Sequence, residues 1–211
     1  ICGIGREHLP EVIKTGEEIG SLTPEAAAQL GLSQDVKVIS GAQDQYMAAL
    51  GNGVLSAGEA LLSCGTSWCL TCIMDKPFFD HQSYFAVARH AVEGLWAAFA
   101  YSPAGGAAFE WVRKNILPVW ADGELEGYGE IEKQVENIRP GSDGLIFLPH
   151  FAGMLFPKKR TDAKANIVGL DLKHTRYHIA RAMLEGSAFD MRMMLEALGG
   201  SGVAVRQMKA L

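Results

Sequence analysis

The sequence lacks the features that would direct it to a membrane, to secretion or to nucleic acid. Its 211 residues contain no apolar run long enough to cross a bilayer, and the N-terminus lacks the charged-then-apolar pattern of a signal peptide. The formal charge is −5, and residues 158–160 form the only basic cluster, so no electrostatic footprint for DNA, RNA or an anionic membrane is present. We expect a cytoplasmic protein without nucleic-acid or membrane partners.

Cysteine is scarce as well, with Cys2, Cys64, Cys69 and Cys72 the only four. Cys69 and Cys72 have C-x-x-C spacing, but residues three apart on a strand point to opposite faces, and no second ligand pair follows. The spacing therefore favours buried, reduced thiols over a metal or redox site. No metal-binding residues are predicted.

The common catalytic signatures are missing too, namely the P-loop, His-Glu-x-x-His, the nucleophile elbow and the Rossmann glycines. What the sequence does contain is pairs of strands followed by buried helices and further strands, which indicates a layered α/β domain. The first half is expected to contain a helix at 23–31, a strand at 36–39, two strands in 59–74 that break at 64–67, and a hairpin in 84–102 that turns at 93–94. The second half is expected to contain a helix that begins near 106, loops and a peripheral helix in 121–144, and a buried strand in 144–151. The last element is a helix from 175 to 198 that is apolar on two sides and ends at 199–200.

Three glycine-containing turns lie next to these strands, where ligands collect in α/β folds. The first, residues 41–45, places Asp44 between a strand and a helix. Asp44 can cap the helix by accepting hydrogen bonds from its first amides, or it can take the proton from a substrate hydroxyl. The residues alone leave both roles open and favour the cap, because carboxylates are common at helix starts.

The other two turns also have two interpretations each. Residues 65–67, Gly-Thr-Ser, can offer backbone amides and hydroxyls to phosphate oxygens, or can form an ordinary hairpin turn. Gly105 and Gly106 precede a helix that carries Glu110. These glycines can expose helix amides to an anion, or can allow the helix to pack closely on a strand.

In this order and spacing, the turns resemble motifs of the FGGY family of carbohydrate kinases, which includes xylulose, gluconate and glycerol kinases. The similarity covers nearly the whole chain. "LPEVIKTGEEIGSLTPEAAAQLGL" is similar to the family's lead-in to its second domain, and "VISGAQDQYMAALGNGVLSAGEALLSCGTSW" resembles its Gly-Asp-Gln and Gly-Thr motifs. "AGGAAFEWVRK" resembles its nucleotide-contacting helix, and "VGLDLKHTRYHIARAMLEG" resembles its second signature.

The resemblance implies a role for each turn. Asp44 matches the family's catalytic base, and Gln45 matches a neighbouring position that contacts the sugar. Residues of the other two turns match nucleotide contacts: Gly65, Thr66 and Ser67 at the phosphates of ATP, and Gly106 and Glu110 on the following helix. His178 and Glu185 belong to the second signature and are expected to be structural, because a helix buried on two sides must pair its few polar groups.

The resemblance also implies an actin-like ATPase fold of two ribonuclease H-type domains, built from mixed sheets with flanking helices, that close on sugar and ATP. Residues 1–211 correspond to most of the second domain, with the first domain and an adenine-binding segment absent. The start at Ile1 rather than Met agrees with a piece of a longer protein. We expect this fragment alone to have no kinase activity and at best weak ATP affinity.

The activity implied for the complete protein is ATP-dependent phosphorylation of a sugar hydroxyl with Mg²⁺, as in a xylulokinase-like enzyme acting on an open-chain ketose. A polyol or sugar-acid kinase is the alternative among enzymes. A catalytically dead actin-like module that binds nucleotide or a protein is the alternative outside them. A small-molecule sugar and ATP are the expected partners, and a homodimer is left open.

Overall fold

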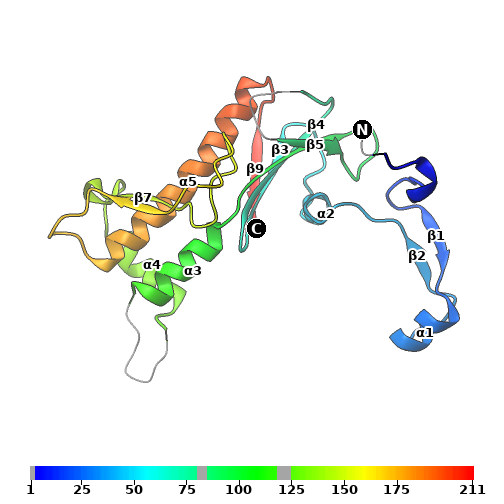
Figure 1. Cartoon of the computed structure of the whole chain (residues 1–211), viewed down its shortest axis with the longest axis horizontal. Helices are drawn as coiled ribbons and strands as arrows, with labels where there is room; N and C mark the ends of the chain where they lie inside the picture. The colour runs from blue at the N-terminus through cyan, green and yellow to red at the C-terminus, as the bar shows by residue number, and fades with distance from the viewer. Residues whose placement is uncertain (1–2, 80–84, 118–124) are drawn as a thin grey trace.

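The computed structural model describes residues 3–79, 85–117 and 125–211, and its centre is a five-stranded mixed sheet (Figure 1). The strands follow the spatial order β5-β6-β4-β3-β9, and only the β3–β9 pair is parallel. Their bounds are β3 Glu59–Cys64, β4 Trp68–Met74, β5 Ala86–Arg89, β6 Trp96–Ser102 and β9 Gln207–Ala210.

The two predicted strand pairs are confirmed as antiparallel neighbours in this sheet. β3 and β4 join through residues 65–67, and β5 and β6 join through a turn in which Gly94 has a φ of 82°. The register sets Ser63 opposite Cys69, and Cys69 opposite Tyr101. These three side chains therefore form one row across a single face of the sheet, close to the β3–β4 turn.

A helix covers each face of the sheet. On one face, α5 (Arg176–Gly200) packs Met191, Met194 and Leu198 against the strands, in a cluster that includes Cys72. On the other face, α2 (Asp44–Gly51) packs Tyr46 and Ala49 into a separate cluster. Cys72 lies in the cluster under α5, whereas Cys69 belongs to the opposite face, so the predicted split of the C-x-x-C pair is confirmed.

A third cluster extends the molecule beyond the sheet. It joins the first half of α5 to α3 (Gly105–Asn115), α4 (Tyr128–Glu136) and the two-stranded sheet of β7 (Ile146–Leu148) and β8 (Asn166–Val168). The remaining elements are η1 Arg6–His8, β1 Glu18–Ser21, α1 Pro24–Leu30, β2 Lys37–Ile39 and η2 Ser142–Gly144. In Figure 1, α1, β1 and β2 lie at the opposite end of the molecule from α3 and α4.

The short helix α1 forms for the reasons its sequence predicts. Thr23 is the N-cap, and its hydroxyl oxygen accepts a hydrogen bond from the Ala26 amide at 3.2 Å. Pro24 occupies the first helical position, where its missing N–H costs nothing. Gly31 ends the helix with a φ of 67°, a left-handed conformation that glycine adopts without strain.

Two sequence predictions need correction. The strand expected to be buried, β7, exposes Ile146 and Leu148 at 54% and 41%, because it pairs only with β8 and buries Phe147 alone. The long helix α5 runs through both glycines that were expected to end it. It was also expected to be apolar and packed on two sides, but its Phe189 is 56% exposed.

Parts of three predictions lie outside the described residues, namely Cys2, residues 80–84 and residues 118–124. No helix within the described ranges is long and apolar enough to cross a membrane.

Candidate active site

A hollow of about 420 Å³ lies where the start of α2 faces the β3–β4 turn. It contains five of the seven predicted site residues: Asp44, Gln45, Gly65, Thr66 and Ser67. Its other lining residues were not predicted as site residues and are Gln43, Ser63, Cys69, Phe99 and Tyr101. Two turns that are separated by about twenty residues in the chain thus meet at one cavity, as a ligand site in an α/β fold requires.

The start of α2 separates the two roles considered for Asp44. Gln43 is the N-cap, and its side-chain oxygen accepts hydrogen bonds from the amides of Gln45 and Tyr46 at 3.0 and 3.3 Å. Asp44 is the first helical residue, and its Oδ1 accepts one hydrogen bond from the Gln45 amide at 2.8 Å. Because Gln43 caps the helix, the Asp44 carboxylate is held by a single amide and is free for another task.

The surroundings of Asp44 suit a reactive carboxylate. The residue is exposed, and among the described residues no cation forms an ion pair with it. Cys69 lines the same hollow, and its thiol has a pKa raised by burial first and then by the negative charge of Asp44. Beside them, the amide oxygen of Gln45 is buried without a hydrogen-bond partner in the described structure.

The β3–β4 turn is held from behind by the start of α3. The Ala107 amide donates to the Thr66 carbonyl at 3.0 Å, and the Ser67 hydroxyl donates to the Pro103 carbonyl at 3.1 Å. A Cβ on Gly106 would lie 2.2 Å from the Gly65 carbonyl oxygen. The glycine pair therefore serves close packing of α3 on the turn, which is one of its two interpretations, and this packing fixes the turn at the edge of the hollow.

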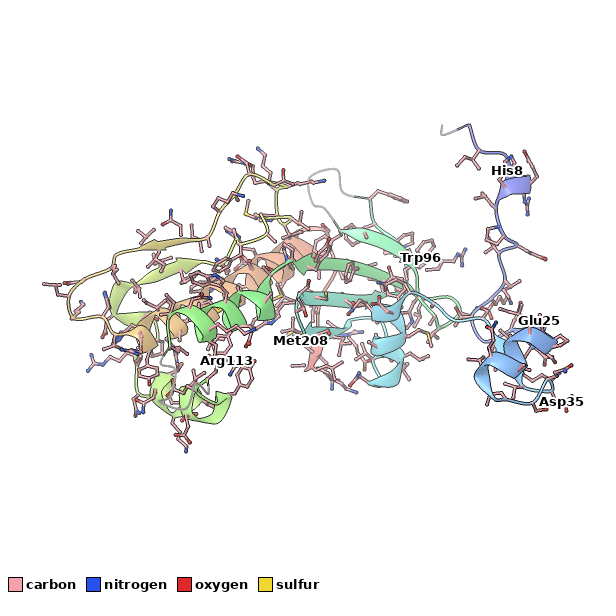
Figure 2. The ribbon with its side chains drawn as sticks, turned by 60° about the horizontal axis from the view of Figure 1, so that its bottom comes forward. His8, Glu25, Asp35, Trp96, Arg113 and Met208 are labelled. Atoms are coloured by element: carbon pink, nitrogen blue, oxygen red, sulfur yellow. The ribbon has the colours of Figure 1, made fainter. Side chains whose placement is uncertain are left out.

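Gly106 and Glu110 are the two predicted site residues that do not line the hollow: Gly106 packs behind the turn, and Glu110 has its contacts on α3 and α4. Its carboxylate receives two hydrogen bonds from Arg113 at 2.8 and 2.9 Å and one from the Tyr128 hydroxyl at 3.0 Å, and it lies 3.2 Å from the Lys114 ammonium. Figure 2 labels Arg113 on the part of α3 that faces α4. These contacts, the Arg113 hydrogen bond first, lower the pKa of Glu110 to about 2.

Four of the lining residues that were not predicted, Ser63, Cys69, Phe99 and Tyr101, are brought together by the pairing of the strands. Ser63, Cys69 and Tyr101 belong to one row, and Phe99 follows two residues back along β6 on the same face. Alternation along a strand assigns these side chains to a face, but only the pairing of the strands shows that they share it.

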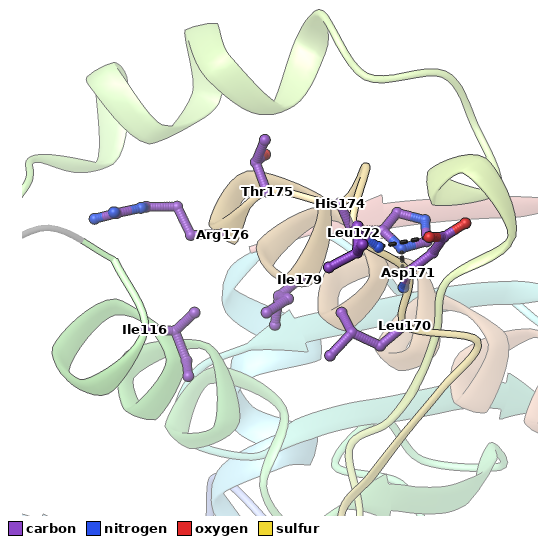
Figure 3. A pocket seen from close by; sticks show the side chains of 8 residues that line it. All are labelled: Ile116, Leu170, Asp171, Leu172, His174, Thr175, Arg176 and Ile179. Atoms are coloured by element: carbon purple, nitrogen blue, oxygen red, sulfur yellow. Dashed lines mark hydrogen bonds between the residues drawn. The ribbon is translucent and has the colours of Figure 1, made fainter.

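A second hollow, of about 980 Å³, lies between the end of α3 and the start of α5 (Figure 3). It contains none of the predicted site residues, and its lining is Ile116, Leu170, Asp171, Leu172, His174, Thr175, Arg176 and Ile179. The hydrogen bond from the Asp171 amide to His174 Nδ1, drawn in Figure 3, joins two lining residues to each other. The smaller hollow is the candidate site, because five of the seven predicted site residues line it.

The signature residues His178 and Glu185 have structural contacts. His178 forms a capping box with Thr175 at the start of α5. Glu185 accepts hydrogen bonds from the Gly141 amide, the Ser142 hydroxyl and Arg181 at 2.8 to 3.0 Å. His178 thus stabilises the start of α5 and Glu185 ties α5 to residues 141–142, which agrees with the structural role expected of them.

The comparisons with known proteins cover nearly the whole chain. The model described as "FGGY family of carbohydrate kinases, C-terminal domain" matches residues 60–211, and the corresponding N-terminal domain model matches residues 1–51. The gluconokinase of Bacillus subtilis (strain 168) is 30% identical over 210 residues, and the xylulose kinase of the same strain is 27% identical over 203. These matches cover 94% and 96% of this chain, which spans only 39% and 40% of those relatives.

Solved structures show the same similarity. The xylulose kinase from Rhodospirillum rubrum superposes with a TM-score of 0.83 at 29% identity, over 98% of this chain and 41% of that one. The gluconate kinase from Lactobacillus acidophilus gives a TM-score of 0.83 at 25% identity, with the same coverage. These neighbours confirm the predicted actin-like, ribonuclease H-type fold. With most of its residues matched by the C-terminal domain model, the chain belongs to the FGGY family of carbohydrate kinases.

Proposed function

We propose that the protein containing this chain transfers the terminal phosphoryl group of ATP to a hydroxyl of a small sugar. One observation carries the proposal: the exposed Asp44 carboxylate and the turn at residues 65–67 line the same hollow. A carboxylate can accept the proton of the attacking hydroxyl, and a turn of amides and hydroxyls can hold phosphate oxygens. Phosphoryl transfer needs both groups near one reacting atom.

In the proposed reaction, the sugar oxygen forms a bond to the γ-phosphorus while the bond from that phosphorus to ADP breaks. The proton of the sugar hydroxyl passes to Asp44, and ADP leaves with the electrons of the broken bond. The Gln45 amide fixes Asp44 Oδ1 at 2.8 Å, which orients the carboxylate before substrate binds. Gln45, whose side chain also lines the hollow, is proposed to orient the sugar.

The hollow fits the phosphate end of ATP with its magnesium ion. Thr66 supplies a hydroxyl, whereas the Ser67 hydroxyl already donates to the Pro103 carbonyl, and Asp44 is the carboxylate among the lining residues. Mg²⁺ is usually held by one or two carboxylates together with the substrate's phosphates, and it supplies charge neutralisation there when bound. Within the described ranges, no three His, Cys, Asp or Glu side chains form a metal site, and Asp44 is proposed as the base, so we assign no metal ligand in this chain.

The identity of the sugar is proposed only as a class. Relatives of similar identity include both xylulose kinases and gluconokinases, so an open-chain ketose and a sugar acid are both candidates. We keep the ketose as the first candidate, and a polyol as the third. The geometry of Asp44 serves each of them equally, because the base requires only a hydroxyl.

We propose that the chain corresponds to most of the second domain of the kinase, together with the segment of residues 1–51 that matches the first-domain model. The isolated chain is expected to have no turnover, since the family resemblance implies that a first domain closes on sugar and ATP. Turnover by this chain above an Asp44→Ala control would contradict that. A cytoplasmic location and a homodimer are further proposals, to be checked by fractionation and by sedimentation.

The test is to assay the full-length protein with ATP and Mg²⁺ against a panel of ketoses, polyols and sugar acids. Asp44→Asn should lower kcat by about 10²- to 10⁴-fold, because the base is lost while the shape of the side chain is kept. Asp35→Asn is the matched control, since Asp35 lies in the loop after α1, away from the sheet (Figure 2). Equal kcat in Asp44→Asn and the parent would refute the base, and no phosphorylation of any acceptor would favour the catalytically dead module.

A further inference from the structure

Two aromatic side chains form one wall of the hollow that contains Asp44. Phe99 and Tyr101 both come from β6 and both line the hollow. Their rings are stacked, with centroids 5.6 Å apart and an angle of 24° between their planes. The pair therefore presents a continuous apolar surface beside a carboxylate.

Tyr101 is the exposed member of this wall. It is 38% exposed, whereas Ala100 and Ser102, its neighbours on β6, are buried. The Tyr101 hydroxyl has no hydrogen-bond partner within the part of the chain that the structure describes. An aromatic ring with a free hydroxyl has both an apolar face and a polar tip available to a ligand.

The strand register places Tyr101 beside the proposed base. Tyr101 pairs with Cys69 across β4 and β6, and both residues line the same hollow as Asp44. The turn at residues 65–67 lies near Cys69, at the end of β4. Phe99 is two residues from Tyr101 on β6, on the side away from that turn. When ATP binds at the turn, an acceptor that places a hydroxyl beside Asp44 can contact Phe99 and Tyr101 with its carbon chain.

We propose that Tyr101 is a specificity-determining residue that contacts the phosphoryl acceptor. The inference rests on the proposed function, and it places the phosphoryl acceptor on the side of the hollow formed by Phe99 and Tyr101. The apolar C–H edges of a polyhydroxylated carbon chain lie on the Tyr101 ring, and the Tyr101 hydroxyl forms a hydrogen bond with one of the hydroxyls of that chain. The ring offers no amide groups, whereas the turn at residues 65–67 does, so the ATP phosphates are assigned to the turn and not to the ring.

The experiment uses the full-length protein and the acceptor that it phosphorylates best. Tyr101→Leu removes the ring and the hydroxyl, and should raise the KM of the acceptor about ten-fold while the KM of ATP changes less than about two-fold. Tyr101→Phe keeps the ring and should raise the acceptor KM about three-fold. Phe189→Leu is the control, because Phe189 is an exposed aromatic residue on α5 outside the hollow.

A binding measurement separates recognition from chemistry. In the Asp44→Asn background, calorimetry with the acceptor alone should show that Tyr101→Leu raises its Kd by about the same factor as the KM. An unchanged acceptor KM and Kd in Tyr101→Leu, with phosphorylation by the parent intact, would overturn this inference and leave the proposed function standing. A rise in the KM of ATP instead would overturn it in favour of a nucleotide contact. Failure of the parent to phosphorylate any acceptor would remove the proposed function and this inference together.

Discussion

Gly106 lies directly against the carbonyl oxygen of Gly65, so that a Cβ added to Gly106 would come within 2.2 Å of it. This contact joins the start of α3 to the turn that we propose binds the phosphates. The hydrogen bond from the Ala107 amide to the Thr66 carbonyl, at 3.0 Å, reinforces it. The position of the turn therefore depends on a helix residue without a side chain.

Substituting Gly106 by alanine tests this dependence. The added methyl group meets backbone atoms, which cannot rotate away, so helix and turn must separate. We expect Gly106→Ala to lower the free energy of unfolding of the chain by about 2 kcal/mol and to raise the KM of ATP in the full-length protein. Urea denaturation and steady-state kinetics measure the two effects.

Gly199→Ala provides the control for that substitution. Gly199 also lies in a helix, but a Cβ there would have no atom within 4 Å. Alanine at this position should raise the free energy of unfolding by about 0.5 kcal/mol, because it lowers the entropy of the unfolded chain. Equal effects of the two variants would contradict the close-packing role of Gly106.

The division of roles between Gln43 and Asp44 gives a second prediction. Gln43 accepts two amide hydrogen bonds at the start of α2, so Gln43→Ala should lower the free energy of unfolding by about 1 kcal/mol. Asp44→Asn should change it by less than about 0.5 kcal/mol, since the replacement keeps an oxygen near the Gln45 amide. Thermal unfolding of both variants decides whether the cap and the proposed base are different residues.

The elements that could be predicted from sequence are those whose apolar runs end in glycine turns. The β3–β4 and β5–β6 pairs were predicted because residues 65–67 and Gly94 interrupt otherwise continuous apolar sequence. The strand β7 was predicted as buried from the same kind of run and is half exposed, because burial depends on the second layer and β7 has α5 on one side only. Local sequence carries no information on what covers the other side.

The same reasoning explains which parts of the site could be predicted. Asp44 and residues 65–67 could be predicted because they carry polar groups in glycine-containing turns. The order of these turns along the chain also resembles the order of the family's motifs. Tyr101 lies in an apolar strand, and only the pairing of β4 with β6 brings it to Cys69. Gln43 was missed because glutamine is not among the preferred N-cap residues, so nothing in its local sequence indicated the cap.

The Glu110–Arg113 pair predicts a pH dependence of stability. Folding lowers the pKa of Glu110 from 4.5 to about 2, mainly through the Arg113 hydrogen bond. A carboxylate with a lowered pKa stabilises the fold above its unfolded pKa, and that contribution is lost as the pH falls from about 4.5 to about 2. Because 30% of the Glu110 side chain is exposed, water screens the pair, and we expect only about 0.5 kcal/mol from it.

The measurement is urea denaturation of the parent and of Glu110→Gln at pH 7 and at pH 2.5. The variant should be less stable at pH 7, and the difference should nearly vanish at the lower pH. Lys133, which pairs with Glu130 on the exposed surface of α4, gives a control in Lys133→Gln, whose effect should be smaller at both pH values. A difference between Glu110→Gln and the parent that persists at pH 2.5 would mean that packing, and not charge, carries the effect.

Asp190 gives a prediction of the opposite sign. It is 6% exposed on α5 and accepts a hydrogen bond from the Ser102 hydroxyl at 3.1 Å. Burial raises the pKa of Asp190, while the charge of His150 and the Ser102 hydrogen bond partly offset the rise. A carboxyl whose pKa is raised in the folded state contributes stability below its unfolded pKa, and that contribution is lost as the pH rises through the folded pKa.

Asp190→Asn removes the charge and keeps an oxygen for Ser102. We therefore expect it to raise the free energy of unfolding at pH 7 by about 1 kcal/mol, and to have almost no effect below about pH 2.5, where the carboxyl is protonated in both states. Urea denaturation across this range measures the difference, with Glu132→Gln on the exposed face of α4 as the control. Destabilisation at pH 7 would mean that the attraction between Asp190 and His150 outweighs the cost of burying the carboxylate.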